Sequence, residues 1–244
     1  MTQSTLQGLL VVSLIVLTAV GLARQCRKPT WWPGLLFARL MNSSHAGVTT
    51  WGLQHVQFEQ HFTILDVGCG GGRTLQRLLA LSPAGKVYGL QHADATVAVA
   101  TKANASSIAA GSVEVRRGSV SNLPFAAHTF DVVTAVETHY YWPDLVRDLE
   151  EFRRVLKLGG RVAIIAESYR GKRLYVADRF AMRLLGGTLL TAREHREALI
   201  AAGYAEVEIF EDSRRGWLCA VGTKAPSGLG PARARGGGTS RPRV

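Results

Sequence analysis

The sequence predicts an α/β protein: a seven-stranded, mostly parallel sheet with an antiparallel last strand and helices on both faces. Short apolar runs that fit buried strands alternate with longer helical stretches from residue 61 onward. Turn residues such as Pro83, Gly111 and Gly203 punctuate the helix ends. This alternation favours a parallel sheet covered on both faces. The last two apolar runs are separated only by Ser213–Gly216, so we expect them to pair antiparallel at one edge.

The expected elements follow one another in a regular order. Strands are expected at Thr63–Val67, Lys86–Leu90, Val113–Arg117, Phe130–Val136, Arg161–Ala166, Glu206–Phe210 and Trp217–Val221. Helices are expected over Arg73–Leu81, Ala95–Ala109, Leu145–Leu156 and Thr191–Ala202. Two further helices should precede the sheet, one beginning at Leu35 and one over Trp51–Phe58, joined by the polar connector Asn42–Thr50.

The chain divides into four segments of different composition. Residues 61–224 form the predicted α/β domain, 1–23 are an uncharged apolar segment, 24–60 a basic and aromatic connector, and 225–244 a Gly-, Pro- and Arg-rich tail expected to be disordered. The net charge is +11, but between Leu40 and Lys224 there are 21 basic and 18 acidic residues. The basicity therefore belongs to the ends, and we do not expect the domain to bind nucleic acid.

The apolar stretch Leu6–Ala23 favours a membrane anchor. It reaches the lower end of the roughly 17–25 residues that span a bilayer. Arg24 and Arg27 follow it directly, and Trp31 and Trp32 are placed as interfacial residues. The positive-inside rule then puts the rest of the chain on the cytoplasmic side. A cleaved signal peptide is disfavoured because no basic residue precedes the stretch; a helix packed on the domain is the alternative.

A glycine-rich loop follows the first expected strand. The segment ILDVGCGGGRTL (Ile64–Leu75) predicts a buried strand, a tight turn and a helix that begins near Arg73. Ligands of α/β sheets bind at the carboxyl ends of the strands, and a helix N-terminus offers unpaired N–H groups to an anion. A dinucleotide is not expected, because the sixth position of the fingerprint G-x-G-x-x-G, counted from Gly68, is an arginine.

The spacing of Gly68, Gly70 and Gly72, with Asp66 two residues before the first, resembles motif I of class I S-adenosylmethionine-dependent methyltransferases. The resemblance continues through VYGLQHADATVAVA, RRGSVSNLPFAAHTFDVV and DLEEFRRVLKLGGRVAII to about Ala166. Within this family, the segment DLEEFRRVLKLGGRVAII resembles the branch that acts on small molecules, which includes methyltransferases of quinone biosynthesis. The resemblance implies a Rossmann-like fold and S-adenosylmethionine as cofactor.

The resemblance also implies which residues hold the cofactor. Gln91 stands where the family usually has an acidic residue for the ribose hydroxyls, and Ser119 stands where many members have Asp for the adenine amine. Both substitutions remove the charge that strengthens such hydrogen bonds. The expected cofactor-binding residues are Asp66, Gly68, Cys69, Gly70, Gly72, Gln91, His92, Ser119, Val120 and Glu137.

The segment ETHYYWPD after the fourth expected strand should lie beside the cofactor. We expect His139 as general base, since its ordinary pKa is near neutrality, with Tyr140 as the second catalytic residue. Tyr141 and Trp142 would line an acceptor pocket or shelter the sulfonium by cation–π contact; packing in the core is the alternative. No histidine or cysteine spacing matches a metal site, so no metal is expected.

The sequence therefore predicts methyl transfer from S-adenosylmethionine to a small-molecule or lipid-like acceptor. The basic insert Ser168–Gly187 is placed to cover an acceptor, or it is a solvated helix face. Two other functions stay open: a nucleic-acid methyltransferase, which the missing N/D-P-P-Y/F motif disfavours, and a non-catalytic donor-binding module tethered to a membrane. Neither the acceptor nor the oligomeric state follows from the sequence.

Overall fold

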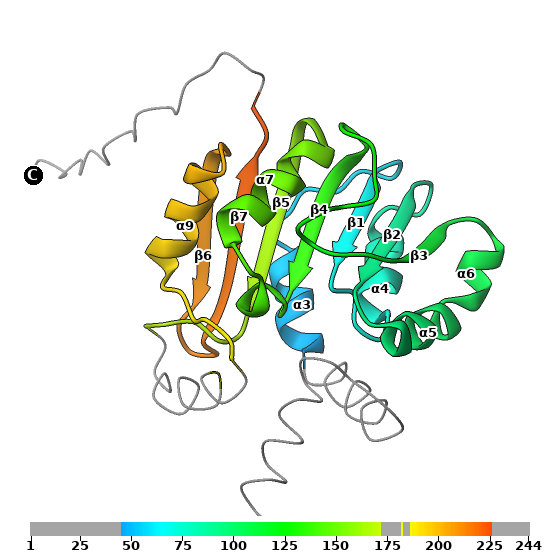
Figure 1. Cartoon of the computed structure of the whole chain (residues 1–244), viewed down its shortest axis with the longest axis horizontal. Coiled ribbons are helices and arrows are strands. Elements are labelled where there is room, and N and C mark those ends of the chain that lie inside the picture. The colour runs from blue at the N-terminus through cyan, green and yellow to red at the C-terminus, as the bar shows by residue number, and fades with distance from the viewer. Residues whose placement is uncertain (1–44, 172–181, 183–185, 226–244) are drawn as a thin grey trace, which may run out of the picture.

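The computed structural model describes residues 45–171, 182 and 186–225. Its elements are α3 (Ala46–Leu53), β1 (Thr63–Val67), α4 (Arg73–Leu81), β2 (Lys86–Gln91), α5 (Asp94–Ala103), α6 (Ala105–Ala109), β3 (Val113–Arg117), β4 (Phe130–Val136), η1 (His139–Tyr141), α7 (Leu145–Val155), β5 (Leu156–Ala166), α9 (Ala192–Ala201), β6 (Ala205–Asp212) and β7 (Trp217–Thr223). Figure 1 shows them arranged around one sheet.

The seven strands lie in the order β3-β2-β1-β4-β5-β7-β6. The pairs among β1 to β5 are parallel, whereas β7 runs antiparallel to both β5 and β6. The predicted fold class is confirmed. The chain adds β2 and β3 on one side of β1 and then crosses back to add β4 and β5 on the other side, so the strand order switches between β1 and β4. Such a switch point is where sheets of this kind bind ligands.

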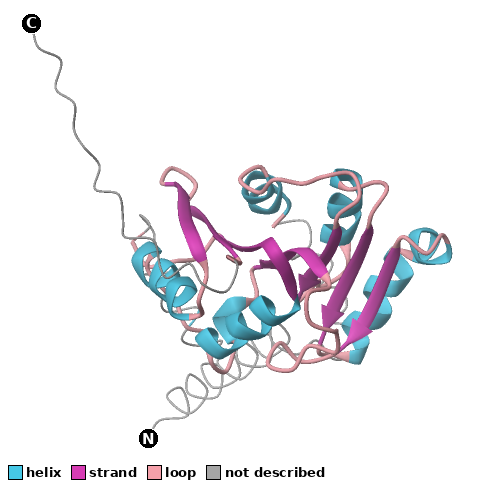
Figure 2. Ribbon diagram, turned by 90° about the horizontal axis from the view of Figure 1, so that it is seen from above, coloured by secondary structure: helices cyan, strands magenta, loops and turns pink. Residues whose placement is uncertain are grey.

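Helices cover both faces of the sheet, as Figure 2 shows from above. On one face α7 and α9 bury Leu149, Phe152 and Leu199 against the strands. On the other face α3, α4 and α5 form a second core cluster. Neighbouring strand residues such as Ile164 and Ile165 belong to opposite clusters, because successive side chains of a strand point to opposite faces. Both faces are apolar, which explains the continuous apolar strands in the sequence.

The first described helix lies further upstream than predicted. Helix α3 covers Ala46–Leu53, so the prediction of a connector over Asn42–Thr50 is wrong from residue 46 onward. The polar residue Thr49 fits inside the helix because its hydroxyl donates to the carbonyl oxygen of His45 at 2.7 Å. Gly52 faces β5 so closely that a Cβ atom there would lie 2.6 Å from Ile165 Cγ2.

Two other boundaries differ from the prediction. The single helix expected over Ala95–Ala109 is divided at Asn104, whose side-chain amide donates to the carbonyl oxygens of Ala100 and Gly72. Strand β5 already begins at Leu156, and its register against β4 shifts between Phe130 and Val132. The predicted stop at Gly159-Gly160 is therefore an irregularity within the strand.

Residues 1–44 and 226–244 lie outside the described residues, and with them the expected membrane anchor, the helix from Leu35 and the basic tail. Residues 172–181 and 183–185, which make up most of the basic insert, also lie outside the described residues. Among residues 45–171, 182 and 186–225, no helix combines the length and apolar character needed to cross a membrane.

Candidate functional site

The glycine loop after β1 adopts backbone conformations that favour glycine. Gly68, Gly70 and Gly72 have φ angles of +79°, +51° and +83°. The backbone N–H groups of Gly68 and Cys69 donate to the carbonyl oxygen of Leu90, at 2.8 and 3.2 Å, and so tie the loop to β2. A Cβ atom on Gly72 would lie 2.4 Å from the Asn104 amide nitrogen. Glycine is therefore required by local backbone and by packing.

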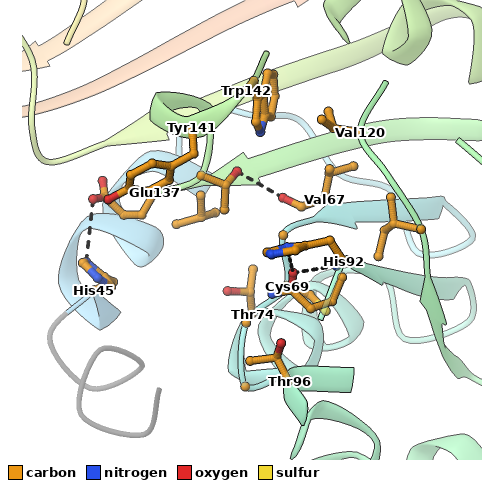
Figure 3. Close-up of a pocket in the computed structure, with 18 of the residues that line it drawn as sticks. His45, Val67, Cys69, Thr74, His92, Thr96, Val120, Glu137, Tyr141 and Trp142 are labelled. Atoms are coloured by element: carbon orange, nitrogen blue, oxygen red, sulfur yellow. Dashed lines mark hydrogen bonds and ion pairs between the residues drawn. The ribbon is translucent and has the colours of Figure 1, made fainter. Parts of the chain in front are cut away.

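A cavity of about 420 Å³ opens over this loop, at the carboxyl ends of β1, β2, β3 and β4. This volume lies within the range of roughly 300–1,000 Å³ typical of small-molecule sites. Figure 3 shows side chains from α3, the glycine loop and the segment after β4 arranged around it. The lining residues are His45, Thr49, Val67, Gly68, Cys69, Gly70, Gly71, Arg73, Thr74, Arg77, Leu90, Gln91, His92, Thr96, Gly118, Ser119, Val120, Val136, Glu137, Thr138, Tyr141, Trp142 and Pro143.

Eight of the ten expected cofactor-binding residues line this cavity, and Asp66 and Gly72 do not. Gly72 instead caps α4. Asp66 is buried under the loop and accepts a hydrogen bond from the Thr134 hydroxyl at 2.7 Å. Burial raises the pKa of its carboxyl group to about 7, although the bond from Thr134 opposes the shift. Gly72 and Asp66 therefore hold the glycine loop in place without lining the cavity.

The Gln91 side chain lies at the end of β2. Its carbonyl oxygen accepts from the backbone N–H of His92 at 2.8 Å and lies 2.9 Å from the His92 ring nitrogen Nδ1. The Gln91 amide nitrogen makes no hydrogen bond within the described part of the chain, so it remains a donor for a bound hydroxyl group. Ser119 accepts from the Ser121 N–H at 3.3 Å and keeps its own hydroxyl hydrogen.

Glu137 forms the opposite wall of the cavity, with a left-handed backbone at φ +58°. Its side chain is 10% exposed. The carboxylate atom Oε1 accepts from the Tyr140 hydroxyl at 3.0 Å and from the Glu167 backbone N–H. Burial, with the nearby Glu167 carboxylate, raises the pKa of Glu137 to about 7. Figure 3 shows His45 approaching this carboxylate from α3's side.

The structure does not bring His139 or Tyr140 to the cavity. His139 is 4% exposed, and its Nε2 lies 3.0 Å from Nε2 of the buried His195. Burial, and secondarily His195, hold the pKa of His139 well below its ordinary value. Burial raises the pKa of Tyr140 well above its ordinary value. Neither side chain lines the cavity, and the expected catalytic roles of His139 and Tyr140 stay predictions.

The neighbouring aromatic residues line the cavity, and Trp142 also packs against the core. Trp142 lines the cavity and also packs edge-on against Phe152 of the core, with ring centroids 5.1 Å apart. Tyr141 lines the cavity and places its hydroxyl 3.9 Å from the Met182 sulfur. Cys69 also lines the cavity, but burial raises the pKa of its thiol, which keeps it protonated.

Several lining residues were not predicted from the sequence. Arg73, Thr74 and Arg77 come from the first turns of α4, directly after the glycine loop. Positions one, two and five of a helix share a face, and this signal was available in the sequence. Thr49 and Thr96 lie on α3 and α5, and no motif or spacing in the sequence links them to the glycine loop.

Known proteins share this arrangement. Residues 65–164 match the family model described as a methyltransferase domain. The chain is 38% identical over 108 residues to a demethylmenaquinone methyltransferase of Lactococcus lactis, covering 44% of this chain and 42% of that protein. It is 31% identical over 160 residues to the corresponding enzyme of Oceanobacillus iheyensis, covering 63% and 62%. The chain thus spans less than two thirds of either relative.

Solved structures share the fold. A putative methyltransferase, solved in complex with the Trm112 methyltransferase activator of Haloferax volcanii, superposes with a TM-score of 0.68 at 22% identity, over 78% of this chain and 94% of that one. Geranyl diphosphate C-methyltransferase of Streptomyces coelicolor, solved with S-adenosyl-L-homocysteine, has a TM-score of 0.63 at 15% identity, over 74% and 79%. With the glycine loop, these findings show that residues 65–164 form a methyltransferase domain similar to those of quinone methyltransferases, and that the chain has the fold of S-adenosylmethionine-dependent methyltransferases.

Proposed function

We propose that the chain transfers a methyl group from S-adenosylmethionine to a small-molecule or lipid-like acceptor. The cavity above the glycine loop carries this proposal, because it joins a cofactor-type loop to an aromatic and carboxylate wall in one space. S-adenosylmethionine supplies an electrophilic methyl group on a positively charged sulfur. Methyl transfer requires the protein to orient the two reactants and to exclude water.

The chain's own residues fit these tasks. Gly68 and Gly70 let a ligand approach the backbone closely, and the N-terminus of α4 offers N–H groups to a carboxylate. Gln91 and Ser119 are proposed to hold the ribose and the adenine. The rings of Tyr141 and Trp142 would shelter a positive charge and bound the acceptor space.

The small-molecule class rests on two further observations. Curated relatives include demethylmenaquinone methyltransferases and a nocamycin O-methyltransferase. The charge of the domain is nearly balanced between Leu40 and Lys224, whereas nucleic-acid binding depends on basic surfaces that neutralise phosphates.

Calorimetry with S-adenosylhomocysteine tests the cofactor site directly. We expect one molecule bound per chain and at least a tenfold weaker affinity in Gly70→Val, because Gly70 lines the cavity and its positive φ, +51°, disfavours a β-branched side chain. Gly111→Ala is the matched control, since Gly111 also has a positive φ, +76°, but a Cβ atom there would have no neighbouring atom within 4 Å and would lie outside the cavity. No heat of binding with the wild type would reject the proposal.

Incubation with methyl-labelled donor identifies the acceptor. Labelled product should appear in extracts of metabolites or lipids, and Gly70→Val should abolish it. Label found only in RNA or DNA would favour the nucleic-acid alternative. Donor binding without label in any fraction would favour the non-catalytic module.

We also propose that the segment Leu6–Ala23 attaches the domain to the cytoplasmic face of a membrane, on the strength of its apolar length and the basic residues that follow it. Full-length protein should remain in the membrane pellet after carbonate extraction, and a version starting at residue 24 should not. Release of the full-length protein by carbonate would contradict the attachment.

A further inference from the structure

A histidine and two glutamates from separate parts of the chain converge at one wall of the cavity. His45 precedes α3, Glu137 follows β4 and Glu167 follows β5. One ligand-type atom of each lies within 4.8 Å of the others. Nδ1 of His45 is 3.0 Å from Glu167 Oε1 and 3.9 Å from Glu137 Oε2. We propose that these three side chains bind a divalent first-row transition-metal cation.

The two distances from His45 Nδ1, 3.0 and 3.9 Å, fit a common central ion. Metal–ligand distances for imidazole and carboxylate are about 2.0–2.2 Å, which puts neighbouring ligand atoms roughly 3–4 Å apart. His45 Nδ1 lies 3.0 Å from the Glu167 carboxylate oxygen and forms an ion pair with it when the ring is protonated. A cation bound between the same atoms would take the place of this proton.

Glu137 provides an independent observation. Its side chain is nine-tenths buried, and Oε1 already accepts from the Tyr140 hydroxyl and the Glu167 N–H. Oε2 accepts no hydrogen bond within the described part of the chain, and it is the atom on the His45 side. Hydrogen bonds that fix one carboxylate oxygen and leave the other for a cation are typical of outer-shell support in metal sites.

The ligand set indicates the class of ion. Mg²⁺ and Ca²⁺ prefer oxygen ligands alone, whereas one imidazole with two carboxylates suits Mn²⁺, Fe²⁺ or Zn²⁺. The two carboxylates neutralise a doubly charged ion. Because His45 and Glu137 line the cavity, the remaining coordination positions would face the space for the acceptor; only this link to methyl transfer rests on the proposed function.

Electron paramagnetic resonance of Mn²⁺ added to the full-length protein tests the site. Free Mn²⁺ gives a strong signal that binding removes, so we expect loss corresponding to one ion per chain. Glu167→Gln and His45→Gln should each weaken the affinity at least tenfold, and Tyr140→Phe, which removes one of the two hydrogen bonds to Glu137 Oε1, about tenfold. Glu150→Gln is the control, since it removes an exposed carboxylate on α7 and should change nothing.

The same samples separate this proposal from the proposed function. S-adenosylhomocysteine binding, followed by calorimetry, should persist in Glu167→Gln, which shows that the variant is folded. Mn²⁺ affinity equal in wild type, Glu167→Gln and His45→Gln, or no binding of either Mn²⁺ or Zn²⁺ by wild type, would overturn the metal site while leaving the cofactor result untouched. Should His45→Gln fail to fold, Glu167→Gln decides alone, because the Glu167 side chain is 33% exposed.

Discussion

Asp66 is a carboxylic acid enclosed by the sheet. It is 1% exposed and bonded to Thr134. Burial penalises its charged form, which raises the pKa from 3.8 to about 7. Because the pKa of Asp66 is higher in the folded state than in the unfolded state, the protonated carboxyl group favours folding. This contribution to the free energy of unfolding is fully present below pH 3.8 and is lost as the pH rises through 7. The protein therefore carries a destabilising buried carboxylate under its glycine loop at alkaline pH.

Replacing Asp66 by Asn should remove this pH dependence. The asparagine side chain would keep an acceptor for the Thr134 hydroxyl but cannot ionise. The free energy of unfolding of Asp66→Asn, relative to wild type, should rise by on the order of 2 kcal/mol between about pH 5 and pH 8. Urea unfolding at the two pH values measures the difference. An offset that is equal at both values would show that the carboxyl group titrates normally.

Gln91 permits a test of the ribose position. A carboxylate there keeps the bond from the His92 N–H and offers charged hydrogen bonds, which are about twice as strong as neutral ones. Gln91→Glu should therefore bind S-adenosylhomocysteine about tenfold more tightly, measured by calorimetry. Gln57→Glu, on an exposed side chain outside the cavity, should leave the affinity unchanged. Weaker binding by Gln91→Glu would place the ribose elsewhere.

The residues missed in the sequence share a physical reason. Glycine spacing predicts the cofactor loop because the backbone there demands glycine. His45 and Glu167 are 122 positions apart in the numbering, and only the folded sheet brings them within 3.0 Å. The expectation of no metal rested on short spacings in the sequence, and it stays a prediction that the Mn²⁺ experiment above tests. The expectation for His139 used its ordinary pKa, and burial, which lowers that pKa, follows only from the fold.

Among the secondary-structure elements, the strands were the best predicted. Their two apolar faces leave continuous apolar runs in the sequence, and β1, β3 and β4 have the predicted bounds. Helix α3 was misplaced because its contact face consists of Thr49, Gly52 and two apolar residues, Val48 and Leu53. Such a face shows little helical amphipathicity, so tertiary packing, rather than local pattern, sets its position.

The close contact of α3 with β5 predicts the effect of Gly52→Ala. The new Cβ would lie 2.6–2.7 Å from three atoms of Ile165, and such overpacking typically costs about 1–3 kcal/mol. Because α3 carries Thr49 and follows His45, its displacement should also weaken S-adenosylhomocysteine binding. Thermal unfolding and calorimetry measure the two effects.

Ile165→Ala supplies the matched rescue for Gly52→Ala. It removes the three atoms nearest to the new Cβ, so Gly52→Ala should cost less stability in that background than in wild type. Equal costs in both backgrounds would show that the clash with Ile165 is not the cause.

Ligand binding should slow amide hydrogen exchange in one part of the molecule and leave it unchanged in another. The cavity draws on α3, the glycine loop and the segment after β4, whereas β6 and β7 contribute no lining residue among those described. S-adenosylhomocysteine should slow amide hydrogen exchange in Ala46–Leu53 and Gly68–Gly72 but not in the β6–β7 pair. Uniform protection throughout would indicate global stabilisation instead.

The distribution of the cavity residues has a consequence for how this protein can diversify. All of the described lining residues fall between His45 and Pro143, while β5, β7, β6 and α9 complete the sheet and one core. The stretch from Leu156 onward thus contributes to folding stability without lining the cavity, whereas the stretch before it contributes to both. A library that randomises Tyr141 and Trp142 together with Thr49 can explore new acceptors, and stabilising substitutions from Leu156 onward can help the fold to tolerate them.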